Sequence, residues 1–163
     1  MSYGEGGFTP LDTIRGRDYP ALTQFTVFLE NRVGQLMEVI RRFDGTNVRI
    51  LALSINDSTE CAVARFLLSN PETGREILER SGFPLIESQL VALELPDTAQ
   101  PMLTVCTALL RAELNISQAY PLFSRPHGRP VVALMVDNIE RAVETLTECG
   151  FQMITEDDLI FDV

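Results

Sequence analysis

The strongest constraint on the fold of this 163-residue chain is a pattern that recurs 68 positions apart. One helical pattern opens at Asn70 and closes at Gly82, and a second opens at Asn138 and closes at Gly150. Residue identity between the two copies is low, but the same elements recur in the same order. The chain is therefore predicted to contain two copies of one structural unit.

Each copy shows six segments of alternating type. Runs rich in β-branched and aromatic residues predict strands, and apolar residues at three- and four-residue spacing predict helices. Asn70 is the expected N-cap of the second helix, with Pro71 at its first position. The segments of the first copy are a strand at 25–30, a helix at 33–43, strands at 48–55 and 61–69, a helix at 71–80 and a strand at 85–89. Those of the second are a strand at 90–95, a helix at 101–114, strands at 116–123 and 131–137, a helix at 139–149 and a strand at 151–155.

This order predicts an α+β fold of two tandem ferredoxin-like βαββαβ units with antiparallel sheets. The expected bounds are an N-terminal extension at 1–22, a first domain at 23–89 and a second domain at 90–163. Residues 131–136 are apolar without alternation, so the face of the sheet that carries no helices is expected to be buried as well. We expect a homodimer to cover part of it. The alternative is that the contact between the two units suffices.

Composition excludes several kinds of partner. The chain has 13 Lys and Arg against 23 Asp and Glu, a formal charge of −10, which argues against nucleic acid and against an anionic membrane surface. No apolar run is long enough to span a membrane, and the first twenty residues lack the apolar core of a secretory signal. Three cysteines without a C-x-x-C pair are typical of a reduced compartment, so a cytoplasmic location is predicted.

Catalytic chemistry is hard to find in the sequence. His127 lies alone in a loop between Arg125 and Arg129, without a partner or nucleophile at recognisable spacing. We interpret it as part of a solvated hairpin turn, with weak anion capture by the two arginines as the alternative. No catalytic residue, metal site or cofactor is expected.

The cysteines and the acidic C-terminal stretch have simpler interpretations. Cys106 and Cys149 fall on apolar helix faces and Cys61 begins a strand, so all three are predicted to be small core residues. Residues 156–158 are all acidic but lack metal-loop spacing, and we expect a solvated terminal stretch there.

The loop between the first strand and the first helix is the most informative segment. It is short and polar at Asn31 and Arg32, and Gly34 lacks the Cβ that would keep a ligand away. The first turn of a helix leaves N–H groups that favour an anion. These features suit a zwitterionic small molecule, although on the residues alone a plain N-cap is the favoured interpretation of Asn31.

Four features of the sequence carry a family resemblance: the tandem βαββαβ order, the segment 28–36, the entry Asn47-Val48 to the second strand and the N-I-x-x-x-Y pattern at 115–120. In these features the chain resembles the ACT domain family. The resemblance covers about residues 23–160. ACT domains are small regulatory domains that typically bind amino acids at interfaces between domains. The resemblance implies that backbone N–H groups around 33–36 receive the ligand carboxylate and that a side-chain oxygen of Asn31 takes its ammonium. The implied ligand-binding residues are Asn31, Arg32, Val33, Gly34, Gln35 and Leu36.

The second copy offers Asp97, Thr98, Ala99 and Gln100 at the same place. Gln100 stands where the family has glycine, and its side chain would hinder close approach. Asp97 would still pair with an ammonium group. We therefore expect a doubtful second site, which serves packing if its binding role is lost.

The leading hypothesis is a stand-alone, non-catalytic regulatory protein that senses a free amino acid. The first alternative is a regulatory subunit of an amino-acid biosynthetic enzyme, such as acetolactate synthase, whose small subunit carries an ACT domain. An alternative of another class is a ferredoxin-like enzyme or metal carrier, but the chain has Arg32-Val33-Gly34-Gln35 where a carrier would have C-x-x-C. A dimeric domain that has lost its ligand site is also compatible with the sequence.

Overall fold

The structure of the protein is a computed structural model that describes residues 19–30 and 34–160. Its elements are β1 (Leu22–Glu30), α2 (Gln35–Arg41), β2 (Ile50–Asp57), β3 (Cys61–Leu68), α3 (Pro71–Ser81), β4 (Leu85–Glu94), α4 (Pro101–Arg111), β5 (Ile116–Pro121), β6 (Val131–Val136), α5 (Ile139–Glu148), β7 (Met153–Ile154) and α6 (Glu156–Ile160). The order strand, helix, strand, strand, helix, strand occurs twice when β4 is counted in both copies. The predicted α+β fold of two ferredoxin-like units is confirmed.

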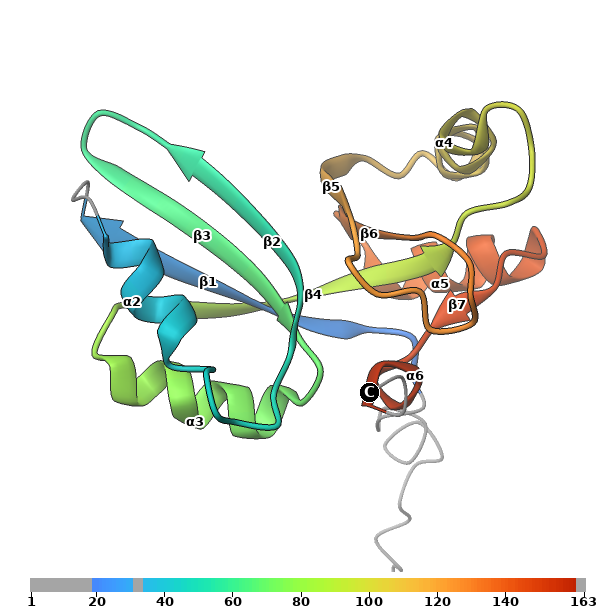
Figure 1. The fold of residues 1–163 in the computed structure, drawn as a ribbon. Helices are drawn as coiled ribbons and strands as arrows, with labels where there is room; N and C mark the ends of the chain where they lie inside the picture. Colours follow the sequence, from blue (N-terminus) through green and yellow to red (C-terminus); the bar gives the residue numbers. More distant parts are fainter. Residues whose placement is uncertain (1–18, 31–33, 161–163) are drawn as a thin grey trace, which may run out of the picture.

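One long strand, β4, belongs to both units and runs between them (Figure 1). Its residues 85–90 pair antiparallel with β1, and its residues 91–94 pair with β6. All strands thereby join one seven-stranded sheet in the order β2-β3-β1-β4-β6-β5, with β7 also on β4. The sequence predicted two separate strands here, and the structure joins them because no turn interrupts Gln89 and Leu90. The expected domain bounds, which meet between these two residues, therefore fall inside a strand and stay a prediction.

The helix caps repeat with the sequence. The Asn70 side chain accepts a hydrogen bond from the Thr73 N–H at 3.2 Å, and the Asn138 side chain accepts one from the Arg141 N–H at 3.0 Å. Gly82 ends α3 in the left-handed conformation, at φ 78°, where glycine is the favoured residue. The N-cap inferred at Asn70 is confirmed, and Asn138 forms the same cap in the second copy.

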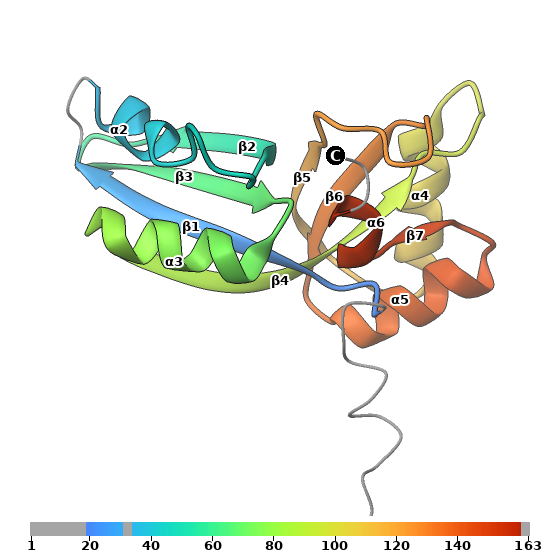
Figure 2. The ribbon, with the colours of Figure 1, turned by 60° about the horizontal axis from the view of Figure 1, so that its bottom comes forward.

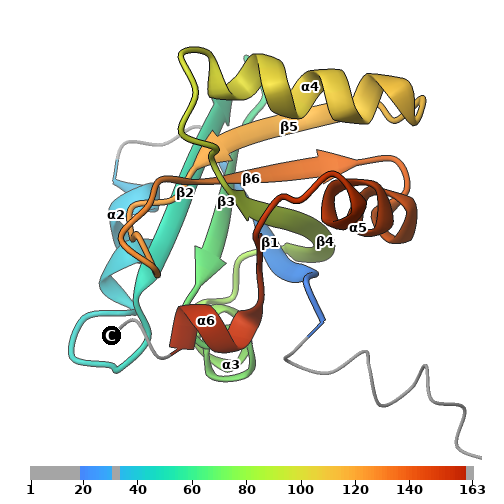
Figure 3. The same ribbon diagram turned by 90° about the vertical axis from the view of Figure 1, so that its right-hand side faces the viewer.

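Three apolar clusters hold the molecule together. In the first unit, α2 and α3 pack on one face of the sheet through residues that include Val39, Leu78 and Phe66. In the second unit, α4 and α5 cover the outer face of β4 and β6 (Figure 3). The third cluster lies between the units and joins the remaining faces of both halves of the sheet. Its members are Leu22, Leu51, Ala52, Leu67, Leu90, Ala92, Tyr120, Leu122, Val131, Ala133, Ile154 and Leu159.

Polar contacts also cross between the units. The Tyr120 hydroxyl donates to the Gln24 side-chain oxygen at 2.5 Å, and the Phe123 N–H donates to the Leu51 carbonyl at 2.6 Å. Burial raises the pKa of Tyr120 above its usual range, so this hydroxyl keeps its proton and remains a donor. The contact between the two units thus covers much of the helix-free face of the sheet, which the apolar pattern predicted to be buried.

The outer face of α4 differs from expectation. Cys106 and Cys149 are exposed and Cys61 is half-buried, so the prediction of three core cysteines was wrong. The helix buries Val105 and Leu109 instead. Because α4 is apolar on two sides, periodicity alone does not decide which side faces the sheet.

The C-terminal acidic stretch is likewise not a solvated tail. Its residues 156–158 form the start of α6, which lies between the two units (Figure 2). The Asp158 carboxylate accepts from the Thr155 N–H at 2.8 Å, and Leu159 is buried in the cluster between the units. Among the described residues, no helix is both long and apolar enough to span a membrane.

Candidate functional site

The expected ligand loop is described only from Gly34 onward. Asn31, Arg32 and Val33 lie outside the described residues. Gly34 has φ +93°, a left-handed conformation that side chains rarely adopt, and a Cβ placed on it would meet no atom within 4 Å. The backbone turn into α2 therefore requires glycine at this position, whether or not a ligand approaches. The Gly34 carbonyl accepts from the Glu38 N–H at 3.0 Å, which starts the helix.

A pocket of about 380 Å³ lies beside this loop, and we call it the first pocket. Its walls come from the end of β1, the start of α2, the start of β3 and the connection between α3 and β4. The described residues that line it are Phe28, Leu29, Glu30, Gln35, Glu60, Cys61, Gly82, Phe83 and Pro84. Of the expected site residues, Gln35 lines this pocket, while Leu36 packs against the core of the first unit.

Gln35 is the unusual residue of the first pocket. It is only 5% exposed, and its side-chain oxygen is buried without any hydrogen-bond partner. Leaving a buried polar group unpaired costs about 1–3 kcal/mol, so proteins rarely do so without a reason. A ligand that donates a hydrogen bond into the pocket would satisfy this oxygen.

A second pocket, of about 250 Å³, occupies the equivalent place in the second unit. Gly82-Phe83 of the first pocket and Gly150-Phe151 of the second lie 68 positions apart in the sequence. The backbone contact beside each also repeats: Phe28 N–H donates to Pro84, and Glu94 N–H donates to Gln152. The residues that line the second pocket are Glu94, Leu95, Pro96, Asp97, Arg129, Gly150, Phe151 and Gln152.

The second expected site is only partly gathered at this pocket. Asp97 lines it, whereas the lining does not include Thr98, Ala99 or Gln100. Gln100 has a negative φ of −133°, which any residue adopts. The glycine of the first loop is absent here because the second loop follows a different backbone path.

His127 lies in an exposed turn, as interpreted from the sequence, but it has partners there. Its Nδ1 lies 2.6 Å from the Glu94 carboxylate and its Nε2 lies 3.3 Å from that of Asp158. The hydrogen bond to Glu94, with the added charge of Asp158, raises the pKa of His127. These partners are 33 and 31 positions away in sequence, beyond the reach of local patterns. Among residues 19–30 and 34–160, no group of three or more His, Cys, Asp or Glu side chains is arranged to hold a metal ion.

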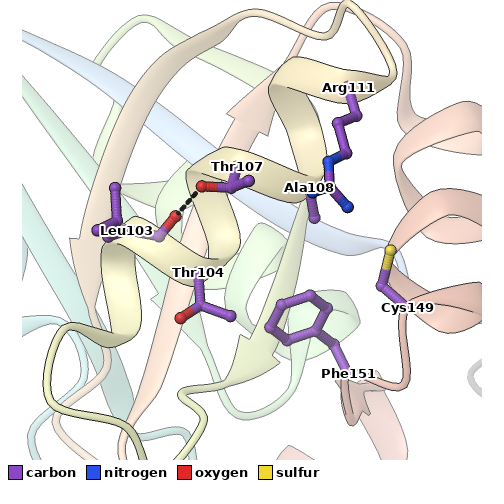
Figure 4. Close-up of a pocket in the computed structure, with 7 residues that line it drawn as sticks. All are labelled: Leu103, Thr104, Thr107, Ala108, Arg111, Cys149 and Phe151. Carbon is purple, nitrogen blue, oxygen red and sulfur yellow. Dashed lines mark hydrogen bonds between the residues drawn. The ribbon is translucent and has the colours of Figure 1, made fainter.

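A third hollow, of about 550 Å³, is a groove between α4 and the end of α5 (Figure 4). Arg111 extends toward Cys149 across it, and the Thr107 hydroxyl donates to the Leu103 carbonyl at 2.7 Å. Its lining contains no buried polar atom without a partner in the described part of the chain. The groove therefore lacks the feature that marks the first pocket.

Sequence reasoning missed Glu60, Cys61 and Phe83 as pocket residues. They lie in the β2–β3 turn, at the start of β3 and after α3, and only the folded sheet brings them beside Gln35. The recurrence of Gly-Phe at 82 and 150 was the one available signal for this wall.

Comparison with known proteins agrees with this architecture. The family model described as an ACT domain pair matches residues 21–162. The structure resembles the protein BT0572 from Bacteroides thetaiotaomicron, with 22% identity, a TM-score of 0.78 and coverage of 86% of this chain and 96% of that one. No curated protein matches the sequence significantly.

Two further solved structures share the fold at lower similarity. The regulatory subunit of aspartate kinase from Thermus thermophilus is 11% identical, with a TM-score of 0.56 and coverage of 83% of this chain and 96% of that one. The corresponding subunit from Thermus flavus is 12% identical, with a TM-score of 0.51 and coverage of 79% and 92%.

Proposed function

Because this chain belongs to the ACT domain pair family, we propose that it is a non-catalytic regulatory protein that binds a free amino acid. The observation that carries the proposal is the buried, unpartnered side-chain oxygen of Gln35 in the first pocket. An α-ammonium group is a hydrogen-bond donor of the kind this oxygen lacks. The family resemblance supports the same region, because it implies a ligand near the loop that leads into α2.

The proposed binding residues are Gly34, Gln35 and Leu36, together with Asn31, Arg32 and Val33 outside the described residues. N–H groups at the start of α2 have no intrahelical partners and would receive the ligand carboxylate. The pocket beside them, at about 380 Å³, falls in the range typical of small-molecule sites. The second loop, with Asp97, Thr98, Ala99 and Gln100, is proposed as a weaker or vacant copy.

The regulated partner is proposed to be an amino-acid biosynthetic enzyme in the cytoplasm. Two structures of the same fold are named as regulatory subunits of aspartate kinase, which supports an enzyme partner of that kind as well as the acetolactate synthase alternative. Co-purification of a larger catalytic chain would support the subunit hypothesis. If the protein purifies without a partner chain and still responds to its ligand, the stand-alone sensor is favoured.

We also propose a homodimer. Leu103 and Leu110 are 66% and 75% exposed on α4, a helix without acidic residues in a chain of charge −10. Two copies would meet there with little charge repulsion. Light scattering should give twice the chain mass, and Leu110→Glu should return the mass of one chain. A monomeric wild type would contradict the proposal.

Thermal unfolding with each of the twenty amino acids tests the function. A ligand present at about 100 times its dissociation constant stabilises the folded state by about 2.7 kcal/mol. For a chain of this size the midpoint should rise by roughly 5–10 °C. If every amino acid leaves the midpoint unchanged, the sensor proposal loses its support.

A further inference from the structure

We infer that two copies of the chain associate through the outer side of α4, with the two helices packed antiparallel about a two-fold axis that passes beside Cys106. The inference rests on the homodimer of the proposed function and adds the geometry of its contact. We call Leu103, Cys106 and Leu110 the α4 seam. Four properties of the seam carry the inference: its exposure, its spacing, its symmetry and its charge.

The α4 seam is an apolar surface on the outside of the molecule. Leu103 is 66% exposed and Leu110 is 75% exposed, although both are large apolar side chains. Cys106, between them in sequence, is exposed as well. Figure 3 shows α4 at the rim of the molecule, with no other described element over its outer side. Adjacent exposed apolar side chains of this kind mark surfaces where proteins associate.

The spacing of the seam suits a helix as the partner. Its three residues follow one another at intervals of three and four positions, so they form one line along α4. This is the spacing with which two helices pack side by side in coiled coils, at about 8–10 Å between their axes. The partner is therefore expected to present a helix of similar apolar character.

The symmetry of the seam favours a second copy of the same helix. Leu103 and Leu110 lie three and four residues on either side of Cys106. When two such helices run antiparallel, Leu103 of each copy lies beside Leu110 of the other, and the two Cys106 side chains meet near the axis. A contact with two-fold symmetry requires a self-complementary surface of this kind.

The charge of α4 favours the same partner. At a net charge of −10, most surfaces of two copies repel each other. The helices α3 and α5 each expose three glutamates, whereas none of the eleven residues of α4 is acidic. The outer side of α4 is thus a place where two copies can meet without facing rows of carboxylates.

The antiparallel direction follows from the charged end of α4. Its one charged residue, Arg111, lies in the last turn. Antiparallel packing places the two Arg111 side chains at opposite ends of the contact. A parallel pair would bring these like charges together and would also align the two helix dipoles, and both effects are unfavourable.

Disulfide formation between single cysteines of the full chain tests the contact. Cys61→Ser/Cys149→Ser keeps Cys106 alone, and the matched control Cys61→Ser/Cys106→Ser keeps Cys149, which is also exposed but lines the groove toward α5 (Figure 4). Dissolved oxygen with a copper catalyst accepts the two electrons and two protons that two thiols release. Because a disulfide needs Cα atoms within about 7 Å, Cys106 should form dimers at least about tenfold faster than Cys149 at micromolar concentration.

Two further sets of variants test the direction and the surface. In a cysteine-free background, Leu103→Cys should not crosslink with itself, because antiparallel packing separates the two positions by about 10 Å along the helix. Its mixture with Leu110→Cys should form a mixed disulfide. Leu110→Glu should abolish the disulfide of Cys106, whereas Phe123→Glu, at a residue 68% exposed outside α4, should leave it intact.

The outcomes separate this inference from the homodimer itself. A dimer by light scattering whose Cys106 forms no disulfide overturns the α4 contact and leaves the homodimer standing. A dimer in which Leu103→Cys crosslinks with itself overturns the antiparallel arrangement. A monomer removes the homodimer and the inference together, while amino-acid binding is decided separately by thermal unfolding. Because the substituted side chains are exposed or half-buried, each variant should keep the circular-dichroism spectrum of the wild type, which checks that it folds.

Discussion

The first and second pockets occupy the same place in two copies of one fold, yet they offer different chemistry. The described lining of the first contains a buried amide oxygen without a partner and two carboxylates, while that of the second contains Arg129 and Asp97, with Glu94 already bound to His127. The sheet and the Gly-Phe wall are common to both. The repeat thus preserves the position of a cavity, while the loops around it change the chemical groups that line it. Four substitutions, each with a control, test how far the two copies differ.

The largest effect is expected at the strand that both units share. Leu90 is fully buried between the units, and Leu90→Ala should lower the free energy of unfolding by about 2–5 kcal/mol through lost burial and a cavity. Ile86, on the same face of β4 and 56% exposed, is the matched control, and Ile86→Ala should cost under about 1 kcal/mol. Urea unfolding of the variants should show one transition, because β4 ties the two halves together. Two separate transitions would show that the units fold independently.

The next largest effect is expected at the glutamine side chain that lines each pocket, Gln35 in the first and Gln152 in the second. Gln35→Leu removes a buried, unsatisfied group, so the unliganded protein should keep its stability or gain up to about 1 kcal/mol. The stabilisation by ligand, about 2.7 kcal/mol at saturating concentration, should disappear. Gln152→Leu in the second pocket is the control, since Gln152 is exposed and lies outside the first pocket. A normal ligand response in Gln35→Leu, measured by thermal unfolding, would place binding elsewhere.

A smaller effect distinguishes the two strand–helix loops. Gly34→Ala places a Cβ at φ +93° and should cost about 1–2 kcal/mol without ligand. The equivalent Gln100→Ala should cost under about 0.5 kcal/mol, because Gln100 has a negative φ and makes no side-chain cap. Chemical denaturation of both variants measures the difference. Equal costs would mean that the first loop does not depend on its left-handed glycine.

The smallest effect concerns the ion pairs of His127, for which the first copy has Thr59 at the equivalent position. The pKa of His127 is raised in the folded state by its bond to Glu94 on β4 and by Asp158 on α6, so its stabilisation is fully present below about pH 6.5, the unfolded value. That stabilisation is lost as the pH rises through the folded pKa. Because the ring is 44% exposed, the contribution should stay under about 1 kcal/mol.

The comparison is between wild type and His127→Gln near pH 5.5 and pH 8.5. The stability difference should be larger at the lower pH. As the single histidine of the chain, His127 gives an unambiguous NMR titration. A midpoint at or below that of a free histidine would contradict the ion pairs.

Much of the fold was predictable because it depends on neighbours in sequence. The caps at Asn70 and Asn138 form within one helical turn, and the order of elements follows from the repeat. The continuity of β4 was not predictable, since two abutting strands and one long strand have the same pattern. The buried side of α4 also required the tertiary structure, because its Leu103–Leu110 stripe is as apolar as the side that packs on the sheet.

The site was predictable only in part, for the same physical reason. The position of Gln35 at the start of a helix was predictable from the sequence. The burial of its side-chain oxygen without a partner depends on the surrounding pocket walls, which include Phe83 and the β2–β3 turn. The partners of His127 come from β4 and α6, and no spacing within its own loop points to them. Where the role of a side chain depends on segments far apart in sequence, the local pattern does not predict that role.

The shared strand has a mechanical consequence. β4 starts directly after Pro84 at the first pocket and ends with Glu94 at the second, so its ten residues form a rod of roughly 33 Å between the two cavities. The rod cannot slide by one residue, because that would exchange Leu90 and Ala92 with Val91 and Leu93 across the sheet. Any signal carried along it must travel as twist or tilt. A ligand that rotated one end of β4 would reorient the wall of the other cavity without breaking any hydrogen bond between the paired strands.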